Sequence, residues 1–158
     1  MKYRLTAFAI MTVVASVGLT ACLQKQQQGA MAPAAMAPAM MTWKAHLTAK
    51  DEVPPNASAA TGDGTFTLNT ATNELTWDVK FSGLTGPALA AHIHGPAAPG
   101  ANAGVLVAFD PPKAPAGEIK GSNVILASQV ADLKAGKWYV NIHTAANKGG
   151  EIRGQLMP

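Results

Sequence analysis

The sequence predicts an all-β domain, an antiparallel β-sandwich or barrel of about eight short strands with room for one short helix. Three observations favour this fold class. Several segments after Thr42 alternate apolar and polar residues with a period of two. Eleven prolines and fifteen glycines interrupt the chain too often for long helices. A chain of 158 residues is long enough for one such domain and too short for two sizeable ones.

The alternation is clearest in the first half of the predicted domain. Residues 43–49 form the first predicted strand, because every second residue is apolar. Residues 64–69 and 74–82 form a predicted hairpin around the turn residues 69–73, with one buried face. The residues expected to face the core from these three strands are Trp43, Ala45, Leu47, Phe66, Leu68, Leu75, Trp77, Val79 and Phe81.

The second half of the domain consists of shorter predicted elements. A helix is predicted over residues 128–135, because Ser128 can cap its start and Gly136 can end it. The remaining segments are short and are separated by stretches with Gly and Pro turn residues. They predict strands over residues 90–94, 105–109, 118–126, 137–144 and 151–157.

The chain begins with a predicted export signal over residues 1–21. Lys2 and Arg4 precede an uncharged apolar run that is short for a membrane span. The sequence Leu19-Thr-Ala-Cys22 resembles a bacterial lipobox, in which the cysteine becomes the lipidated first residue of the mature protein. Because Cys22 is the only cysteine, we favour this interpretation over an ordinary signal peptide with a free cysteine nearby. We therefore expect a lipid-anchored protein of the bacterial cell envelope, on the periplasmic or outer-membrane side.

Residues 22–41 are predicted to be the lipidated cysteine and a flexible tether, followed by the domain over residues 42–158. The tether is rich in Gln, then in Ala, Pro and Met, and it lacks the branched and aromatic residues that build a core. Its methionines offer soft thioether ligands that suit Cu(I), although an ordinary linker role explains them as well. These methionines are Met31, Met36, Met40 and Met41.

Three histidines on two predicted strands form a candidate metal site. His92 and His94 are two residues apart, so on a strand both side chains point to the same face, about 6.5–7 Å apart. His143 ends a strand whose apolar residues occupy the alternate positions, so it is also expected to point outward. If these strands are neighbours, the three imidazoles form a surface cluster suited to copper or zinc, with His46 as a further candidate ligand. Hydrogen bonding to nearby turns would explain the same histidines without a metal.

Charged residues near the end of the chain form a second candidate group. Arg153 is the only arginine left once the signal is removed, and Glu151 lies two residues before it on the same predicted face. We expect a structural ion pair between Arg153 and either Glu151 or Glu52, through the forked hydrogen bonds that a guanidinium group makes with a carboxylate.

Five short motifs occur in an order that spans residues 43–157. They are Glu52-Val-Pro-Pro55, Ser82-Gly-Leu84, Ala91-His-Ile-His-Gly-Pro96, Tyr139-Val-Asn-Ile-His-Thr144 and Gly150-Glu-Ile-Arg-Gly-Gln155. Together they resemble the chordin-type domain, called CHRD, which occurs in bacterial secreted proteins and in the animal developmental protein chordin. The resemblance implies an immunoglobulin-like β-sandwich or barrel and no general enzymatic activity. Lys148 stands where the family commonly has a proline.

Composition argues against several classes of function. The formal charge of +3 falls to +1 when Lys2 and Arg4 are removed with the signal, which gives no support for nucleic-acid binding. A single cysteine is incompatible with an internal disulfide framework or a cysteine-rich zinc site. We find no phosphate-binding loop, nucleophile–base arrangement or pair of carboxylates at an informative spacing, so we expect no enzyme.

Two main hypotheses of function follow from the sequence. The first is a non-enzymatic lipoprotein that binds a metal ion, with copper preferred, for copper capture or tolerance in the envelope. The alternative is a protein–protein interaction or structural module of the envelope that holds no metal. A copper oxidase or dismutase is a third and less favoured hypothesis, because it needs an open coordination position at the metal.

Overall fold

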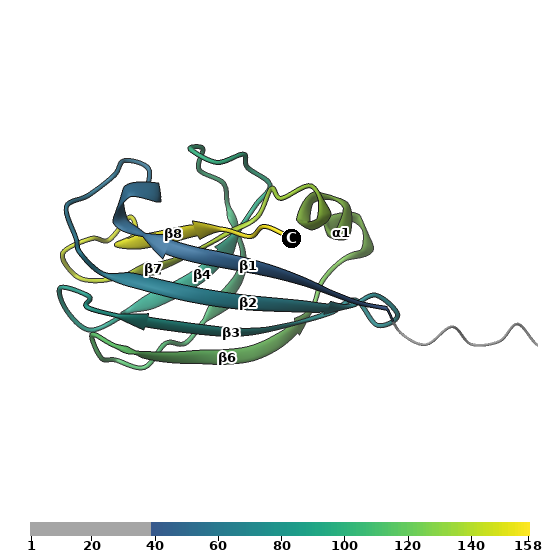
Figure 1. The fold of residues 1–158 in the computed structure, drawn as a ribbon, viewed down its shortest axis with the longest axis horizontal. Coiled ribbons are helices and arrows are strands. Elements are labelled where there is room, and N and C mark those ends of the chain that lie inside the picture. Colours follow the sequence, from purple (N-terminus) through teal and green to yellow (C-terminus); the bar gives the residue numbers. More distant parts are fainter. Residues whose placement is uncertain (1–38) are drawn as a thin grey trace, which may run out of the picture. The chain divides into compact units, whose positions relative to one another are not determined.

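The computed structural model describes residues 39–158, which form the all-β domain that the sequence predicts (Figure 1). Its eight strands join into one antiparallel sheet, whose edge strands approach each other to give a nearly closed barrel. The strands are β1 (Met40–Thr48), β2 (Thr61–Asn69), β3 (Glu74–Ser82), β4 (Ala90–His94), β5 (Val105–Phe109), β6 (Gly117–Val124), β7 (Tyr139–His143) and β8 (Ile152–Gln155). Their order in the sheet is β5-β4-β7-β8-β1-β2-β3-β6.

Strand β1 begins inside the segment that we expected to be tether. Met40 and Met41 pair with Asn69 and Leu68 at the end of β2, so the ordered domain starts two residues before the expected boundary at Thr42. The physical reason is that β2 extends far enough to supply backbone partners for both methionines. The predicted signal peptide, Cys22, Met31 and Met36 lie outside the described residues.

The α-helix α1 (Ala127–Lys134) confirms the predicted helix. The predicted N-cap residue, Ser128, is wrong. Leu126 is the N-cap residue, and its backbone N–H donates to Oε1 of Gln129 at 2.8 Å. Ser128 therefore lies inside the helix and does not cap it. Gly136 ends the helix as predicted, with a φ of +66° that favours glycine. A short 3-10 helix, η1 (Ala49–Asp51), follows β1, and no helix within residues 39–158 is long and apolar enough to cross a membrane.

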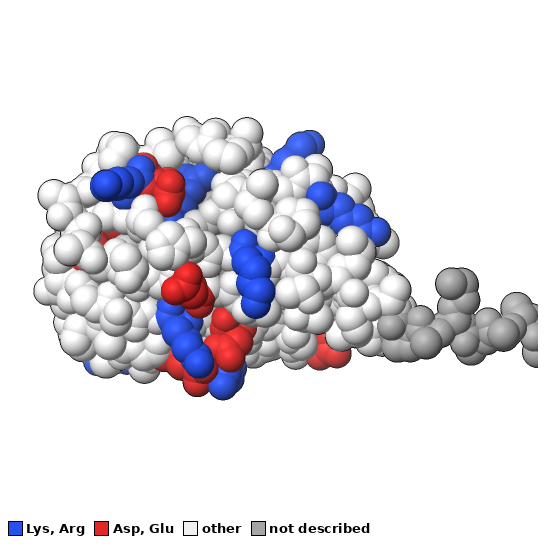
Figure 2. All heavy atoms as spheres, in the orientation of Figure 1, with Lys and Arg blue, Asp and Glu red and all other residues white. Residues whose placement is uncertain are grey.

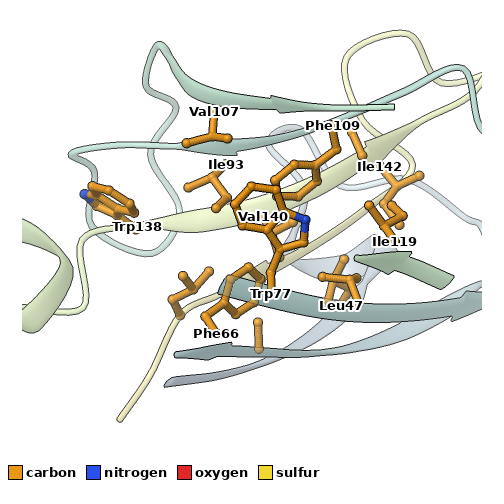
Figure 3. Packing of buried hydrophobic residues seen from close by; sticks show 14 of the residues in the cluster. Leu47, Phe66, Trp77, Ile93, Val107, Phe109, Ile119, Trp138, Val140 and Ile142 are labelled. Carbon is orange, nitrogen blue, oxygen red and sulfur yellow. The ribbon is translucent and has the colours of Figure 1, made fainter. Parts of the chain in front are cut away.

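The predicted alternation produces the core of the barrel. Trp43, Leu47 and Phe66 are among the fully buried side chains on the predicted inner faces. Trp77 of β3 stacks on Phe109 of the edge strand β5 with ring centroids 4.5 Å apart, so side chains from the two ends of the sheet meet in the core (Figure 3). Each such side chain contributes about 1.5–3 kcal/mol by leaving water. The hydrophobic effect therefore closes the barrel, because β5 and β6 share no ladder of backbone hydrogen bonds.

The outer face of the barrel is not uniform. Lys80 and Lys120 project into solvent from β3 and β6 beside carboxylates. On β4, β7 and β8, by contrast, the outward side chains include Asn141 and Arg153, which are 3% and 1% exposed. Loops cover this part of the sheet and create a second, polar interior on its outer side. The candidate site lies in that region.

Candidate metal centre

Strands β4 and β7 bring the three predicted histidines together. The two strands are adjacent and antiparallel, with Ala90 opposite His143 and His92 opposite Asn141. His92 and His94 point to one face, and His143 lies diagonally across from His92 on that face. One ring nitrogen from each of the three residues lies within 4.8 Å of the others. The predicted cluster of His92, His94 and His143 is therefore present in the folded chain.

Hydrogen bonds fix the ring of His143. Its Nδ1 lies 3.0 Å from the carbonyl oxygen of Lys148. Because a carbonyl oxygen only accepts, the proton is on Nδ1, and Nε2 carries a lone pair. That Nε2 lies 2.9 Å from Nδ1 of His92, which donates to it. A histidine whose far nitrogen donates to a backbone carbonyl is oriented as metal-ligating histidines usually are.

His94 is the buried member of the cluster. It is 9% exposed, because the loop between β4 and β5 covers it. Its Nδ1 lies 3.0 Å from the carbonyl oxygen of Ala103, and its Nε2 lies 3.1 Å from Oδ1 of Asn141. The expectation that the cluster is a surface one is therefore wrong for His94. The alternation along β4 does not indicate this burial, because residues of the following loop form the cover.

The environment keeps two of the imidazoles neutral. Burial lowers the pKa of His92 below its ordinary 6.5, and the nearby rings of His143 and His94 lower it further. Burial also lowers the pKa of His143, and this effect outweighs the opposing hydrogen bond to Lys148. A neutral imidazole can present a lone pair to a cation, whereas a protonated one cannot. Both pKa shifts therefore favour rings that can offer a lone pair at neutral pH.

His46 does not join the cluster. It lies on β1, which β8 and β7 separate from β4 in the sheet. Its Nδ1 lies 2.9 Å from Oδ1 of Asp63, the residue opposite on β2, and both side chains are exposed. The prediction of His46 as a fourth ligand is therefore wrong, because strand order and not the outward face decides which histidines meet. Met40 and Met41 lie on the same strand β1.

Glu151 forms a buried hydrogen-bond centre instead of an ion pair. The residue is fully buried just before β8. Its carboxylate accepts hydrogen bonds from Oγ of Ser58, from the backbone N–H and Oγ1 of Thr85, and from Oγ1 of Thr144. Burial alone raises the pKa of Glu151, but these hydrogen bonds outweigh it and hold the pKa at about 2. Glu151 therefore remains ionised and ties three loops to the end of the barrel.

Arg153 is likewise satisfied without a carboxylate. Its Nη1 donates to Oδ1 of Asn102 at 3.0 Å, and its Nη2 donates to the carbonyl oxygen of Ala101 at 2.7 Å. The guanidinium carbon lies 3.4 Å from the ring centroid of Tyr139. Among the described residues, no ion pair within 4.0 Å joins Arg153 to Glu52 or Glu151. The predicted ion pair is therefore wrong, because the loop before β5 supplies the partners.

Two residues near the cluster were not predicted as functional positions. Asn141 bonds to His94, and its Nδ2 lies 3.4 Å from the carbonyl oxygen of Gly149. Tyr139 lies with its ring parallel to that of His94, at 4.8 Å between centroids. Both lie on the same face of β7 as His143, so their alternation with the apolar residues was the signal that could have identified them. Both lie on the outer face of β7, yet Tyr139 and Asn141 are 2% and 3% exposed.

The described features define an all-β barrel with a cluster of three imidazoles on the loop-covered part of its outer face. The residues from 43 to 156 match the CHRD domain, so the chain belongs to the CHRD domain family. This confirms the family that the five motifs indicated. No curated protein and no solved structure matches the chain significantly.

Proposed function

We propose that this chain is an exported, lipid-anchored protein of the cell envelope and is not an enzyme. It binds a copper ion through His92, His94 and His143. Its role is to capture copper in the envelope or to confer tolerance to it. The observation that supports this most is the convergence of three ring nitrogens within 4.8 Å. Metal-to-nitrogen distances are about 2.0–2.1 Å, so nitrogens that share an ion lie about 3–4 Å apart. The cluster needs only a small closing movement to reach that spacing.

The donor chemistry fits a borderline metal ion. His143 offers Nε2 and His92 offers Nδ1, the two atoms that now share one proton at 2.9 Å. His94 offers Nε2 once Asn141 gives up its hydrogen bond, while Nδ1 stays bonded to Ala103. When an ion is bound, the proton on Nδ1 of His92 would have to move to Nε2 of the same ring, so that Nδ1 offers its lone pair. No acidic residue belongs to the described cluster, which disfavours the hard ions Ca²⁺ and Mg²⁺.

Three considerations support copper over zinc. Sites built from nitrogen donors bind Cu²⁺ more tightly than Zn²⁺ in the usual order of divalent metals. The predicted tether carries methionines, whose thioethers suit Cu(I). The predicted export signal would place the protein in the envelope, where copper capture protects the cell.

A competition titration with Cu²⁺ tests the proposal. The full-length protein in detergent should bind one equivalent, and His92→Ala/His94→Ala should lower the affinity at least 100-fold. His46→Ala is the matched control, because it removes an imidazole outside the cluster and should leave the affinity unchanged. A parallel titration with Zn²⁺ tests the preference between the metals. Equal Cu²⁺ affinity in the double variant and the original chain contradicts the proposed site.

The proposed anchor is tested independently of the metal. Cys22→Ser should move the protein from the membrane fraction to the soluble periplasmic fraction and abolish incorporation of a labelled fatty acid. Retention of the variant in the membrane contradicts lipidation at Cys22. The copper titration does not depend on this result.

One observation favours a second function, an interaction or structural module without metal. The three histidines already bond to Lys148, Ala103 and Asn141, and so hold loops against β4 and β7. If this is their role, the histidine variants lower the free energy of unfolding, and the native protein purifies without metal. Crosslinking at the cell surface should then recover a specific partner.

A further inference from the structure

Glu52 and Arg153 carry opposite charges, are buried, and line the same cavity without touching. They are 4% and 1% exposed. Both line a cavity of about 380 Å³. Within residues 39–158, neither takes part in an ion pair of 4.0 Å or less. Burying two opposite charges without pairing them costs folding free energy. A ligand that contacts both groups would offset this cost.

The structure holds Arg153 firmly in place. Tyr139 lies against one face of its guanidinium group, and Asn102 and Ala101 each accept one of its five N–H donors. These contacts fix the side chain and leave further donors for a ligand. A guanidinium group that is already oriented loses little conformational freedom when it binds a carboxylate.

The carboxylate of Glu52 lacks a partner on one side. Its Oε1 is buried and has no hydrogen bond. Gly150 makes room for it, because a Cβ at that position would clash with Oε1, and the φ of +139° also favours glycine. Burial raises the pKa of Glu52 to about 7, although the charge of Arg153 and the backbone of Val53 act in the opposite direction. The carboxylate is thus held where an added cation would stabilise it.

The cavity wall carries both signs of charge in balance. Lys50 and Asp51 on η1 lie at its exposed rim, and Pro55 and Pro99 add apolar surface. Figure 2 shows basic and acidic side chains side by side over η1 and β8. An ion of one sign would meet repulsion as well as attraction here. A molecule that carries both signs would find a partner for each.

We propose that this cavity binds a small zwitterion of the α-amino-acid type, with its ammonium group on Glu52 and its carboxylate on Arg153. The guanidinium fork matches a carboxylate. Of the Glu52 carboxylate, Oε2 is the oxygen left to accept from the ammonium group, because Oε1 is buried against Gly150. An α-amino acid holds these two groups on one carbon, which suits two residues that are close but not in contact. The site uses none of the three histidines as a ligand contact, although Tyr139 contacts both His94 and Arg153, and it does not depend on the proposed copper function.

Calorimetric titration of the full-length protein in detergent, without metal, tests the proposal with the twenty common amino acids taken one at a time. At least one should bind with a saturable isotherm. Propionate and ethylamine, which carry only one of the two charged groups, should bind at least tenfold more weakly than that amino acid. Glu52→Gln should lower the affinity for the amino acid at least tenfold, although the side chain hardly changes in size. Arg153→Lys should lower it by a similar factor, because lysine cannot donate two parallel hydrogen bonds to the carboxylate.

Control variants distinguish a zwitterion site from a simple anion site and from binding elsewhere on the barrel. Asp51→Asn at the rim should change the affinity by less than about twofold, because the residue is exposed and its charge is screened. Thr76→Ala on β3, which β1 and β2 separate from β8, should bind the amino acid as tightly as the original chain. Absence of binding by every amino acid overturns the proposal. So does propionate binding that equals the amino acid and survives Glu52→Gln, because the cavity is then a simple anion site.

Discussion

The two parts of the barrel differ in what their outward side chains do. On β3 and β6 these side chains are exposed, and Lys120 meets Asp78 and Glu118 in water. On β7 and β8 the corresponding side chains, Asn141 and Arg153, are buried under loops. The outer face of the first part is therefore hydrated. The second part buries polar groups outside the hydrophobic core, which costs folding free energy.

This contrast shows where the fold buries polar groups, and both proposed sites lie in that part. Solvent weakens exposed ion pairs, which contribute at most about 1 kcal/mol. Buried polar groups are costly unless every one of them is satisfied. Glu151 is satisfied by four hydrogen bonds, whereas Oε1 of Glu52 is not satisfied at all. The histidine cluster and the Glu52 cavity both lie in this layer. Both proposals therefore concern the part of the barrel where buried polar groups lower stability.

Removing the centre of the polar layer should have the greatest consequence for stability. Glu151→Ala leaves Ser58, Thr85 and Thr144 without their acceptor, and we expect it to lower the free energy of unfolding by about 3–5 kcal/mol. Glu118→Ala is the matched control on the exposed part, and its denaturation midpoint should stay unchanged. Guanidinium denaturation measures both. Equal shifts in the two variants would remove the distinction between the two parts of the barrel.

The second effect tests whether the polar layer supports the histidine cluster. Asn141 bonds to His94 and also lies opposite His92. Replacing it with Ala removes this support, so Cu²⁺ affinity should fall about 10–100-fold, as when outer-shell partners of metal ligands are lost. Thr76→Ala on the exposed part of the barrel is the control. An unchanged affinity in Asn141→Ala would show that the cluster is positioned by the strands alone.

Much of the fold could be predicted because strand periodicity is a local property. The alternation around Trp77 placed the core, and the spacing of His92 and His94 placed both on one face. The convergence of His143 was also predicted, since it needs only that β4 and β7 be neighbours. The family could be recognised because its motifs lie in the loops and strands that build the polar layer.

The errors have one physical cause, which is that strand order and loop covers are not local. His46 points outward as predicted, but β8 and β7 separate its strand from β4. Arg153 is two residues from Glu151 in the sequence, yet it donates its hydrogen bond to Asn102, which lies in a distant loop. The burial of His94 depends on the same loop. None of these contacts can be predicted from the spacing of residues along one strand.

The third effect is a pair of opposite pH dependences within the polar layer. The pKa of Glu151 is about 2 in the folded chain, below the ordinary 4.5, so its stabilisation is present above pH 4.5 and is lost as the pH falls towards 2. The pKa of Glu52 is about 7, above 4.5, so its contribution is present below pH 4.5 and is lost as the pH rises through 7. We expect a loss of about 3 kcal/mol for Glu52 over that interval.

Glu52→Gln isolates the second of these dependences. The variant cannot ionise, so its free energy of unfolding relative to the original chain should rise between pH 4.5 and 7. Comparing the two chains at each pH cancels the titration of His92 and His143, which is common to both. A constant difference across this interval would mean that Glu52 already has a cationic partner in the folded protein.

The weakest coupling is expected at His46, which tests the exposed part of the barrel directly. Its contact with Asp63 has the geometry of an ion pair, but the two side chains are 63% and 81% exposed. A double-mutant cycle with His46→Ala and Asp63→Ala should therefore give a coupling of less than about 0.5 kcal/mol. A coupling near that of a buried pair would show that exposure does not separate the two parts of the barrel. A small coupling would agree with a hydrated outer face on this part of the barrel, where an ion pair at 2.9 Å contributes little to stability.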